Sequence, residues 1–123
     1  INITSVHGSV ASANKAAYVA SKHALEGLSK VTALDTAGSG ITCNTIAPGW
    51  VATPLVLRQV EARAEAKGTS QEDEAKALVS EKQPLARFIT PEELGAAVVF
   101  LASEAANSMT GSSLKIDGGW TAV

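Results

Sequence analysis

Short apolar runs alternate with longer stretches of helical periodicity along the chain. Runs rich in β-branched and apolar residues predict buried strands at residues 1–6, 41–47 and 113–116. Apolar positions spaced three and four residues apart predict helices at residues 14–36, 54–67 and 71–82, and a fourth helix beginning at residue 91. Helices that alternate with short strands are typical of βαβ units, which indicates an α/β protein with a parallel sheet.

Capping signals mark several of these helix ends. Thr90 precedes Pro91, and Glu93 lies three residues after the threonine, so a capping box is expected. Ser70 in the same way lies three residues before Asp73. The fourth helix is expected to bury Leu94, Ala97, Val98 and Leu101.

The first predicted helix is rich in alanine and ends before Gly38. Its apolar positions are Ala17, Ala20, Ala24, Leu28, Val31 and Leu34. Small residues would let this helix approach a neighbouring helix closely. The same apolar face could equally belong to the core of the chain itself.

Three strands make only a small sheet. A parallel sheet needs both faces covered and its edges hidden, and on its own this chain would leave one edge of its first strand exposed. The chain also opens at Ile1, without an initiator methionine, as though within a strand. We therefore expect the sequence to be partial and the sheet to be completed by a further segment.

Composition and charge fit a globular protein. Hydrophobic residues make up 46% of the 123 residues and charged residues 18%, with a net charge of −2. Because both signs are dispersed, no basic face indicates binding to nucleic acid or to an anionic membrane. No apolar run reaches the roughly 18–20 residues that span a bilayer. The single cysteine, Cys43, predicts a packed thiol and a reducing compartment, most simply the cytoplasm.

Tyr18 and Lys22 are the clearest candidates for chemistry. Four residues apart on a helix, they project from one face. A nearby cation favours the phenolate form of a tyrosine, and a phenolate can take the proton of an alcohol while hydride leaves the alcohol carbon. Ser5 follows the first predicted strand, where open α/β sheets place ligand contacts, so its hydroxyl could hold the substrate oxygen. Taken singly, these residues also fit an ordinary helix surface and an ordinary turn.

The order and spacing of the motifs resemble the second half of a short-chain dehydrogenase/reductase. The matching segments are Ile3-Thr4-Ser5-Val6-His7-Gly8, Tyr18-Val19-Ala20-Ser21-Lys22, Asn44-Thr45-Ile46-Ala47-Pro48-Gly49 with Thr53-Pro54, and Thr110-Gly111 with Ile116-Asp117-Gly118-Gly119. They cover essentially the whole chain. The resemblance implies the C-terminal, catalytic half of a doubly wound, Rossmann-type parallel sheet, a single domain that is incomplete without its N-terminal half.

The resemblance also implies roles for individual residues. Ser5 would polarise the substrate oxygen, and Tyr18 would be the general acid/base. Lys22 would assist the tyrosine and, with it, hold the nicotinamide ribose. The nicotinamide itself would be lined by Pro48, Gly49, Val51 and Thr53. No metal ion is expected at this site.

Four more residues match the substrate pocket of the bacterial D-3-hydroxybutyrate dehydrogenases of that family, namely His7, Lys15, Gln59 and Trp120. The Lys15 ammonium could bind a carboxylate near the reacting carbon, and Gln59 and His7 could donate hydrogen bonds to it. Trp120 could close the apolar side around a short alkyl chain. The implied reaction is oxidation of (R)-3-hydroxybutyrate to acetoacetate with NAD. Each residue alone also has an ordinary structural interpretation.

Other features of the resemblance concern the rest of the molecule. The sequence contains neither G-x-G-x-x-G nor G-x-x-x-G-x-G, so the turn that holds the pyrophosphate would belong to the missing half. Residues 54–85 are charged and follow the nicotinamide segment, as expected of a mobile lid. The family usually assembles as a dimer of dimers, here through residues 16–35 and 92–116.

Three hypotheses remain open from the sequence. The chain is part of a complete 3-hydroxybutyrate dehydrogenase, or part of a related dehydrogenase with another small hydroxy or keto substrate. Alternatively, it is a truncated, non-catalytic module that buries its open edge against a partner.

Overall fold

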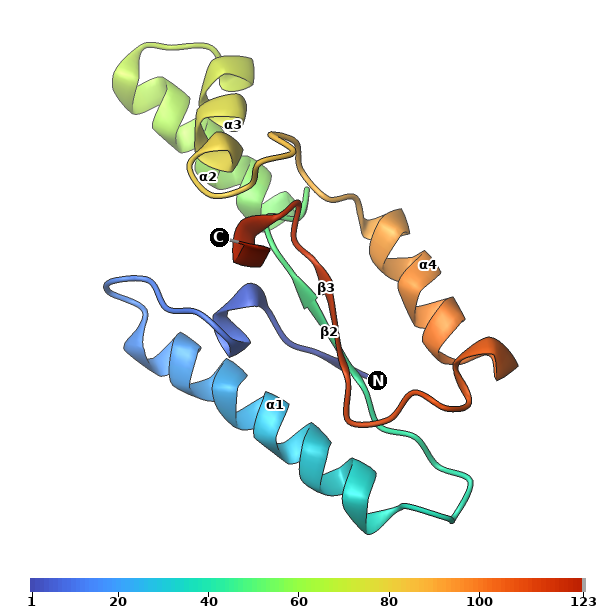
Figure 1. The fold of residues 1–123 in the computed structure, drawn as a ribbon. Helices are drawn as coiled ribbons and strands as arrows, with labels where there is room; N and C mark the ends of the chain where they lie inside the picture. The colour runs from blue at the N-terminus through green and yellow to red at the C-terminus, as the bar shows by residue number, and fades with distance from the viewer. Residues whose placement is uncertain (123) are drawn as a thin grey trace.

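A three-stranded parallel sheet forms the centre of the molecule in a computed structural model that describes residues 1–122 (Figure 1). The strands are β1 (Asn2–Ile3), β2 (Thr45–Pro48) and β3 (Ser113–Ile116), in the spatial order β1-β2-β3. Ile46 of β2 is paired with Ile3 on one side and with Leu114 on the other. The predicted α/β class and the parallel sheet are therefore confirmed.

Four α-helices surround the sheet. They are α1 (Ala16–Asp35), α2 (Pro54–Lys67), α3 (Gln71–Ser80) and α4 (Pro91–Leu101), with short 3-10 turns at Val6–Gly8, Glu104–Ala106 and Trp120–Ala122. Figure 1 shows α1 and α4 on opposite sides of the sheet, and α2 and α3 as a helical hairpin beyond one end of the strands. The predicted range of α2 is confirmed, and α3 ends two residues earlier than expected.

The ends of two strands were predicted wrongly. The first strand contains only residues 2–3, because a 3-10 turn starts at Val6, and Ile1 and Ile3 are about half exposed on this edge strand. The second begins at Thr45 rather than at residue 41, and Ile41 is exposed. Just before β2, the Cys43 N–H donates to the Thr110 hydroxyl, while the Cys43 and Asn44 carbonyls accept from Gly111 and Asn2.

The predicted caps are present. The Thr90 hydroxyl accepts from the Glu93 N–H at 3.2 Å, and the Glu93 carboxylate accepts from the Thr90 N–H at 2.8 Å, which completes the capping box of α4. The Ser70 hydroxyl accepts from the Asp73 N–H at the start of α3. Locally encoded signals therefore determine where these helices begin.

The apolar core lies between α4 and the sheet. Ile46, Leu101 and Ala106 are its buried members, and partly buried residues pack around them: Leu94, Ala97, Val98, Met109, Leu114 and Ile116. The expected inward face of α4 is confirmed. Cys43 is buried as a free thiol, as predicted.

The contact between α1 and the sheet is polar. The Glu26 carboxylate accepts hydrogen bonds from the hydroxyls of Thr4 beside β1, Thr45 in β2 and Ser113 in β3, at 2.6–3.2 Å. A second bond joins Asn2 Nδ2 to the Ser29 hydroxyl at 2.9 Å. One acidic residue of α1 is thus bonded to a residue at each strand of the sheet.

The apolar stripe of α1 faces away from the sheet. All six of its positions are exposed, and Leu28, Val31 and Leu34 are 59%, 54% and 77% exposed. The residues that turn inward are instead Ser29 and Ala33. Of the two interpretations left open by the sequence, the one that placed this stripe in the core of the chain is wrong for residues 1–122.

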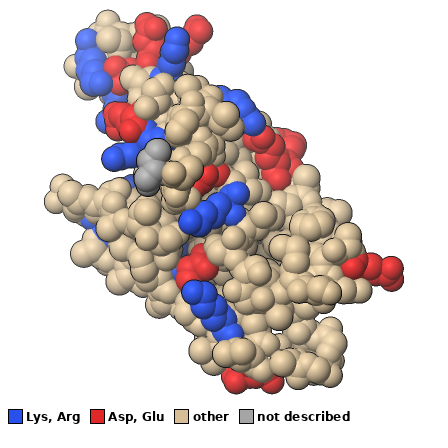
Figure 2. Space-filling view, viewed as in Figure 1, with Lys and Arg blue, Asp and Glu red and all other residues tan. Residues whose placement is uncertain are grey.

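Charged side chains are unevenly distributed over the visible face. Figure 2 shows Lys, Arg, Asp and Glu interspersed around the α2–α3 hairpin, with wide uncharged areas over the remainder of that face. Among residues 1–122, the helices lack the combination of length and apolar character that crossing a membrane requires. The same residues contain no cluster of three or more His, Cys, Asp or Glu side chains arranged to hold a metal ion.

Candidate active site

A cavity of about 620 Å³ lies at the carboxyl ends of the strands, between the start of α1 and the start of α2. Open α/β sheets bind ligands at this edge. Of the predicted catalytic, substrate-binding and cofactor-binding residues, all except Lys22 line it: Ser5, His7, Lys15, Tyr18, Pro48, Gly49, Val51, Thr53, Gln59 and Trp120. Residues separated by up to 115 positions in the sequence are therefore brought to one place.

Ser5 and His7 form the floor on the β1 side, where the chain leaves the strand and turns. Ser5 begins the 3-10 turn, and its hydroxyl oxygen accepts from the His7 N–H at 3.2 Å. The His7 ring places Nδ1 3.4 Å from the Ser5 hydroxyl and Nε2 2.9 Å from the Ser12 hydroxyl. Both residues are buried. His7 therefore holds the serine hydroxyl from two directions.

Tyr18 lies on the first turns of α1, with its side chain 45% exposed at the cavity. Its ring is met edge-on by the ring of His7, with 5.7 Å between the centroids. Lys22 does not line the cavity. Its Nζ lies 5.6 Å from the centroid of the Tyr18 ring and donates to the Ile3 carbonyl at 3.2 Å, which places a cation behind the phenol ring.

Aromatic rings and one cation form the next part of the wall. The Trp120 ring meets the His7 ring edge-on, with 5.6 Å between the centroids, and its centroid lies 6.1 Å from that of Trp50. The Lys15 Nζ lies 5.5 Å from the centroid of the Trp50 ring. The turn before Trp120 is fixed by Asp117, whose carboxylate accepts from Gly119 and Thr121. Burial alone would raise the pKa of Asp117, but these hydrogen bonds hold it below its ordinary value.

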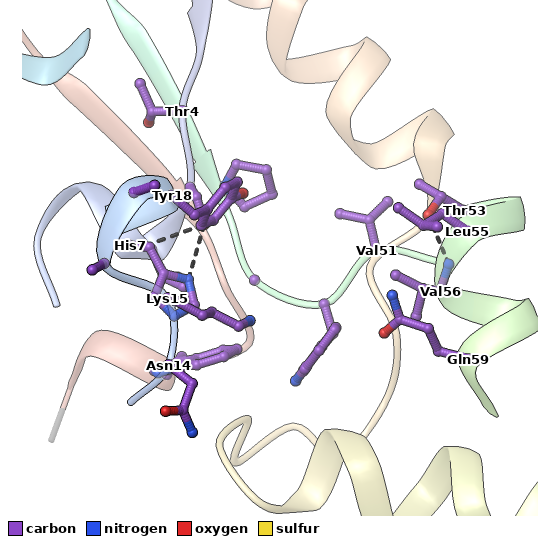
Figure 3. A pocket seen from close by; sticks show the side chains of 18 residues that line it. Thr4, His7, Asn14, Lys15, Tyr18, Val51, Thr53, Leu55, Val56 and Gln59 are labelled. Carbon is purple, nitrogen blue, oxygen red and sulfur yellow. Dashed lines mark hydrogen bonds between the residues drawn. The ribbon is translucent and has the colours of Figure 1, made fainter. Parts of the chain in front are cut away.

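The opposite wall comes from the end of β2 and the start of α2. Val51 forms a parallel bridge with Ile89, and the Thr53 hydroxyl caps α2 by accepting from the Val56 N–H at 3.3 Å. Figure 3 shows Val51, Thr53, Val56 and Gln59 across the cavity from His7, Lys15 and Tyr18. The space between the two groups is where a ligand would contact both.

The described lining of the cavity carries positive charge and no negative charge. Among the described residues, Lys15 carries the only full charge in the lining, which contains no Asp or Glu. The pKa of His7 is lowered by its burial and by the nearby charges of Lys15 and His23, so the imidazole is neutral at neutral pH. One cation among apolar and neutral polar groups suits a small ligand with a single negative charge.

Sequence reasoning missed several residues at or beside the site, among them three with polar side-chain groups. Trp50 and Asn14 line the cavity, and Gln83 is buried behind it. Within residues 1–122 the buried Trp50 Nε1 has no hydrogen-bond partner. An aromatic residue directly after Pro48-Gly49, at the ligand edge of the sheet, was a signal for Trp50. No local pattern pointed to Gln83.

Known proteins match the chain in sequence over nearly all of its length. A family model described as enoyl-(acyl carrier protein) reductase matches residues 1–121. The chain is 57% identical over 122 residues to a D-beta-hydroxybutyrate dehydrogenase of Cupriavidus necator, an alignment that covers 99% of this chain and 47% of that protein. It therefore spans about half the length of the curated relatives it matches.

Solved structures match its fold. A short chain dehydrogenase family protein from Francisella tularensis has a TM-score of 0.89 and 35% identity, over 98% of this chain and 50% of that one. A 4-hydroxyisoleucine dehydrogenase mutant complexed with NADH and succinate has a TM-score of 0.85 and 35% identity, over 99% of this chain and 46% of that one. Other matching structures were solved with NADPH.

The strand order, the residues around the cavity and these matches agree with one another. The chain belongs to the short-chain dehydrogenase/reductase family.

Proposed function

We propose that the protein containing this chain oxidises (R)-3-hydroxybutyrate to acetoacetate with NAD. The observation that carries the proposal is the cavity in which Tyr18 and Ser5 lie beside Lys15, the only charged residue among its described lining. That lining matches an alcohol next to a carboxylate. The 57% identity to a protein named D-beta-hydroxybutyrate dehydrogenase supports the same substrate class.

Tyr18 is the residue that would move the proton. The Ser5 hydroxyl, held by His7, donates to the substrate oxygen and keeps it near the phenol. The Tyr18 oxygen takes the hydroxyl proton as the alcohol becomes a ketone, and the Lys22 cation lies behind the same ring. A nicotinamide held by Pro48, Gly49, Val51 and Thr53 would supply the acceptor for the hydride of the alcohol carbon.

The substrate carboxylate would be bound by Lys15, with Gln59 donating from the opposite wall. His7 already has Ser5 and Ser12 within hydrogen-bond distance of its two ring nitrogens, so we assign it first to holding Ser5. Trp120 covers the short alkyl chain. Because the charge of Lys15 is not offset by an acid in the described lining, an anionic substrate is favoured over a neutral one.

The nicotinamide end of the cofactor fits the residues present. Pro48, Gly49, Val51 and Thr53 line a cavity whose volume of about 620 Å³ lies in the range of small-ligand sites. The Thr53 hydroxyl accepts from Val56, which leaves its proton free to donate to a carboxamide. The glycine-rich turn for the pyrophosphate does not occur in the sequence, so the remaining cofactor contacts would come from the other half of the enzyme.

The rest of the proposal concerns assembly. A further half would pair with the open edge of β1, where Ile1 and Ile3 are exposed, and the α2–α3 hairpin would act as the lid over the substrate. The exposed stripe of α1 would join two copies, as the first contact of a homo-oligomer. The cytoplasm is the proposed compartment, because the buried Cys43 is a free thiol.

A second candidate is a dehydrogenase of the same family acting on a different small hydroxy acid. The matching structure solved with NADH and succinate shows a carboxylate ligand in a related protein. The third possibility, a non-catalytic module, gives no account of why a single cation, Lys15, lies in the cavity beside Tyr18 and Ser5.

The deciding experiment is an assay of the purified intact protein, following NADH absorbance with (R)-3-hydroxybutyrate, its S enantiomer, other short hydroxy acids and a neutral secondary alcohol of equal length. We expect the R enantiomer to give the highest kcat/KM. A higher value for another hydroxy acid would favour the second candidate, and no reaction with any substrate would favour the non-catalytic one. Repeating the assay with NADP tests the cofactor assignment.

A further inference from the structure

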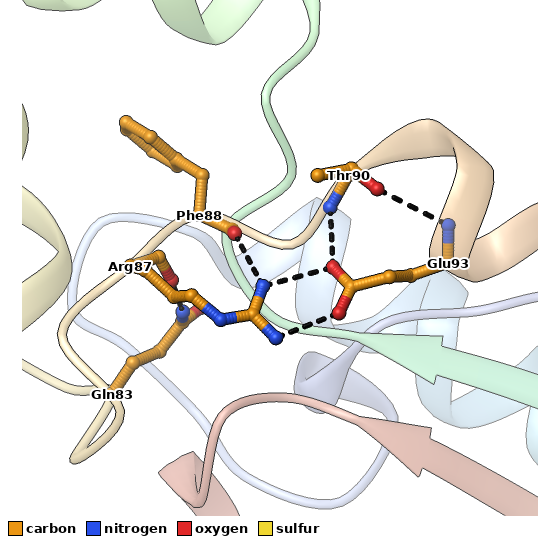
Figure 4. Close-up of polar contacts among 5 residues, drawn as sticks. All are labelled: Gln83, Arg87, Phe88, Thr90 and Glu93. Atoms are coloured by element: carbon orange, nitrogen blue, oxygen red, sulfur yellow. Dashed lines mark hydrogen bonds and ion pairs between the residues drawn. The ribbon is translucent and has the colours of Figure 1, made fainter.

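Gln83 is a polar side chain enclosed by the protein, with 1% of its surface exposed. It lies three residues after the end of α3, where the helical hairpin ends. Its Oε1 accepts a hydrogen bond from the Trp50 N–H. Its Nε2 donates to the Arg87 carbonyl at 2.8 Å, and Gln83 and Arg87 are both drawn in Figure 4. Both ends of the amide are therefore bonded to main chain, one of them directly behind the cavity wall.

Two glycines leave the space that this amide fills. A Cβ at Gly49 would collide with Gln83 Oε1 and come within 3.1 Å of the Asp117 main chain. A Cβ at Gly118 would lie 3.1 Å from Gln83 Nε2, and Gly118 has a φ of +60°, which glycine adopts readily. The amide therefore packs between Gly49, which precedes Trp50, and Gly118, in the turn that leads to Trp120.

The segment that carries Gln83 is itself fixed in place. The Ala86 N–H donates to the Gln83 carbonyl and the Leu85 N–H to the Gly118 carbonyl, at 2.8 and 3.0 Å. Ala86 has a φ of +51°, an unfavourable value for a residue with a side chain, which persists because the surrounding bonds hold the turn. Arg87 continues the connection through its paired contacts with Glu93 at the start of α4 (Figure 4).

We propose that Gln83 is a positioning residue for the substrate cavity. Its amide joins the end of the α2–α3 hairpin to the main chain of Trp50 and to the turn before Trp120, and so sets the spacing of the two tryptophans. This inference rests on the proposed function, because it assigns those rings to the wall of a substrate site. Gln83 itself does not line the cavity.

The test uses variants of the intact protein. Gln83→Met keeps the shape of the side chain and removes both hydrogen bonds. Gln83→Asn stays polar but is too short to make both, and it serves if the first variant does not fold. Gln83→Glu keeps an acceptor for the Trp50 N–H but places an oxygen against the Arg87 carbonyl, so it isolates the loss of the donor end of the amide. The matched control is Asn44→Leu, which removes a buried amide bonded to Met109 and Ser112, away from the cavity.

Two readouts separate positioning from stability. We expect Gln83→Met and Gln83→Asn to raise the KM for (R)-3-hydroxybutyrate by about tenfold or more, with kcat changed much less, because the binding wall moves while the reacting groups stay. Tryptophan emission should change in the same variants, since Trp50 and Trp120 lie on that wall. Gln83→Glu should shift both readouts in the same direction, because it loses the bond to the Arg87 carbonyl, and Asn44→Leu should lower the melting temperature alone.

The outcomes distinguish this proposal from the proposed function. Wild-type KM and emission in Gln83→Met and Gln83→Asn would overturn the role of Gln83, as would the same changes in Asn44→Leu. If the wild type does not oxidise 3-hydroxybutyrate, the proposed function fails. The tryptophan emission of the four variants still decides whether Gln83 fixes the positions of Trp50 and Trp120.

Discussion

The Lys15 ammonium lies 5.5 Å from the centroid of the Trp50 ring, at the edge of the cavity. A cation within about 6 Å of an aromatic face is attracted by the ring, so the tryptophan helps to keep the lysine side chain over the cavity. The described lining provides no carboxylate to neutralise it. The positive charge therefore remains available to a ligand.

Replacing this charge should weaken binding of an acidic substrate. We expect Lys15→Gln to raise the KM for 3-hydroxybutyrate roughly 10- to 100-fold, because a hydrogen bond to a charged group contributes about 1.5–3 kcal/mol. Steady-state kinetics measure the effect, and the control is Lys30→Gln, which changes an exposed lysine of α1 away from the cavity. An equal rise with a neutral alcohol would show that Lys15 does not act through the carboxylate.

Removing the Tyr18 hydroxyl should abolish most of the turnover. General acid/base catalysis contributes about 10²- to 10⁴-fold, so Tyr18→Phe is expected to lower kcat by that factor, while substrate and NADH still bind. NADH absorbance gives the rate, and titration of NADH fluorescence gives the binding. A variant that keeps a tenth or more of the wild-type kcat would remove Tyr18 from the proton transfer.

The buried imidazole of His7 should make the fold sensitive to mild acid. Burial and the charges of Lys15 and His23 lower the pKa of His7 in the folded state below 6.5, its value in an unfolded chain. The unfolded state then binds the proton first, so stability is complete above pH 6.5 and declines as the pH falls below it.

Urea titrations of the intact protein at pH 7.5 and 5.5 measure this decline. His7→Gln should make the difference between the two pH values smaller. The control His23→Gln changes an exposed histidine and should leave most of it in place. An unchanged difference in His7→Gln would assign the acid sensitivity to other groups.

The contribution of the α4 N-cap to the free energy of unfolding should also be measurable by urea titration. Thr90→Ala removes the hydroxyl that accepts from Glu93 and is expected to lower the free energy of unfolding by about 0.5–2 kcal/mol, whereas Thr90→Ser should restore most of it. The assay is urea unfolding at neutral pH. Equal values for the alanine and serine variants would argue against a capping role.

Glu93 extends that test to low pH. Its hydrogen bonds with the Arg87 guanidinium and the Thr90 N–H lower its pKa from 4.5 to about 2. Because the folded-state pKa is depressed, the stabilisation is present above pH 4.5 and is lost as the pH falls toward 2. Glu93→Gln should remove this part of the pH dependence, measured by urea unfolding between pH 5 and 2.5, and retention of it would contradict the assignment.

The helices and the main members of the site could be predicted because their signals are local. Thr90 and Glu93 are three residues apart, and so the sequence shows their cap directly. Ser5 and Tyr18 were found from their positions after a strand and on a helix, combined with a resemblance covering the whole chain. Periodicity also found the apolar stripe of α1.

What could not be predicted depends on contacts between distant residues. Periodicity does not say which side of α1 meets the sheet, and the inward side is polar because Glu26 is bonded to Thr4 after β1, Thr45 in β2 and Ser113 in β3. The start of β2 depends on distant contacts as well, since the Asn44 side chain is bonded to Met109 and Ser112. The place of Gln83 arises from a contact with Trp50, 33 residues away.

The bonds of Glu26 have a practical consequence for redesign of substrate preference. Sliding α1 along the sheet would break hydrogen bonds at all three strands together, so substitutions in the opposite wall, at Val56 or Gln59, should leave Tyr18 where it is. Libraries aimed at longer hydroxy acids can therefore vary Val56 while the proton-transfer groups keep their alignment.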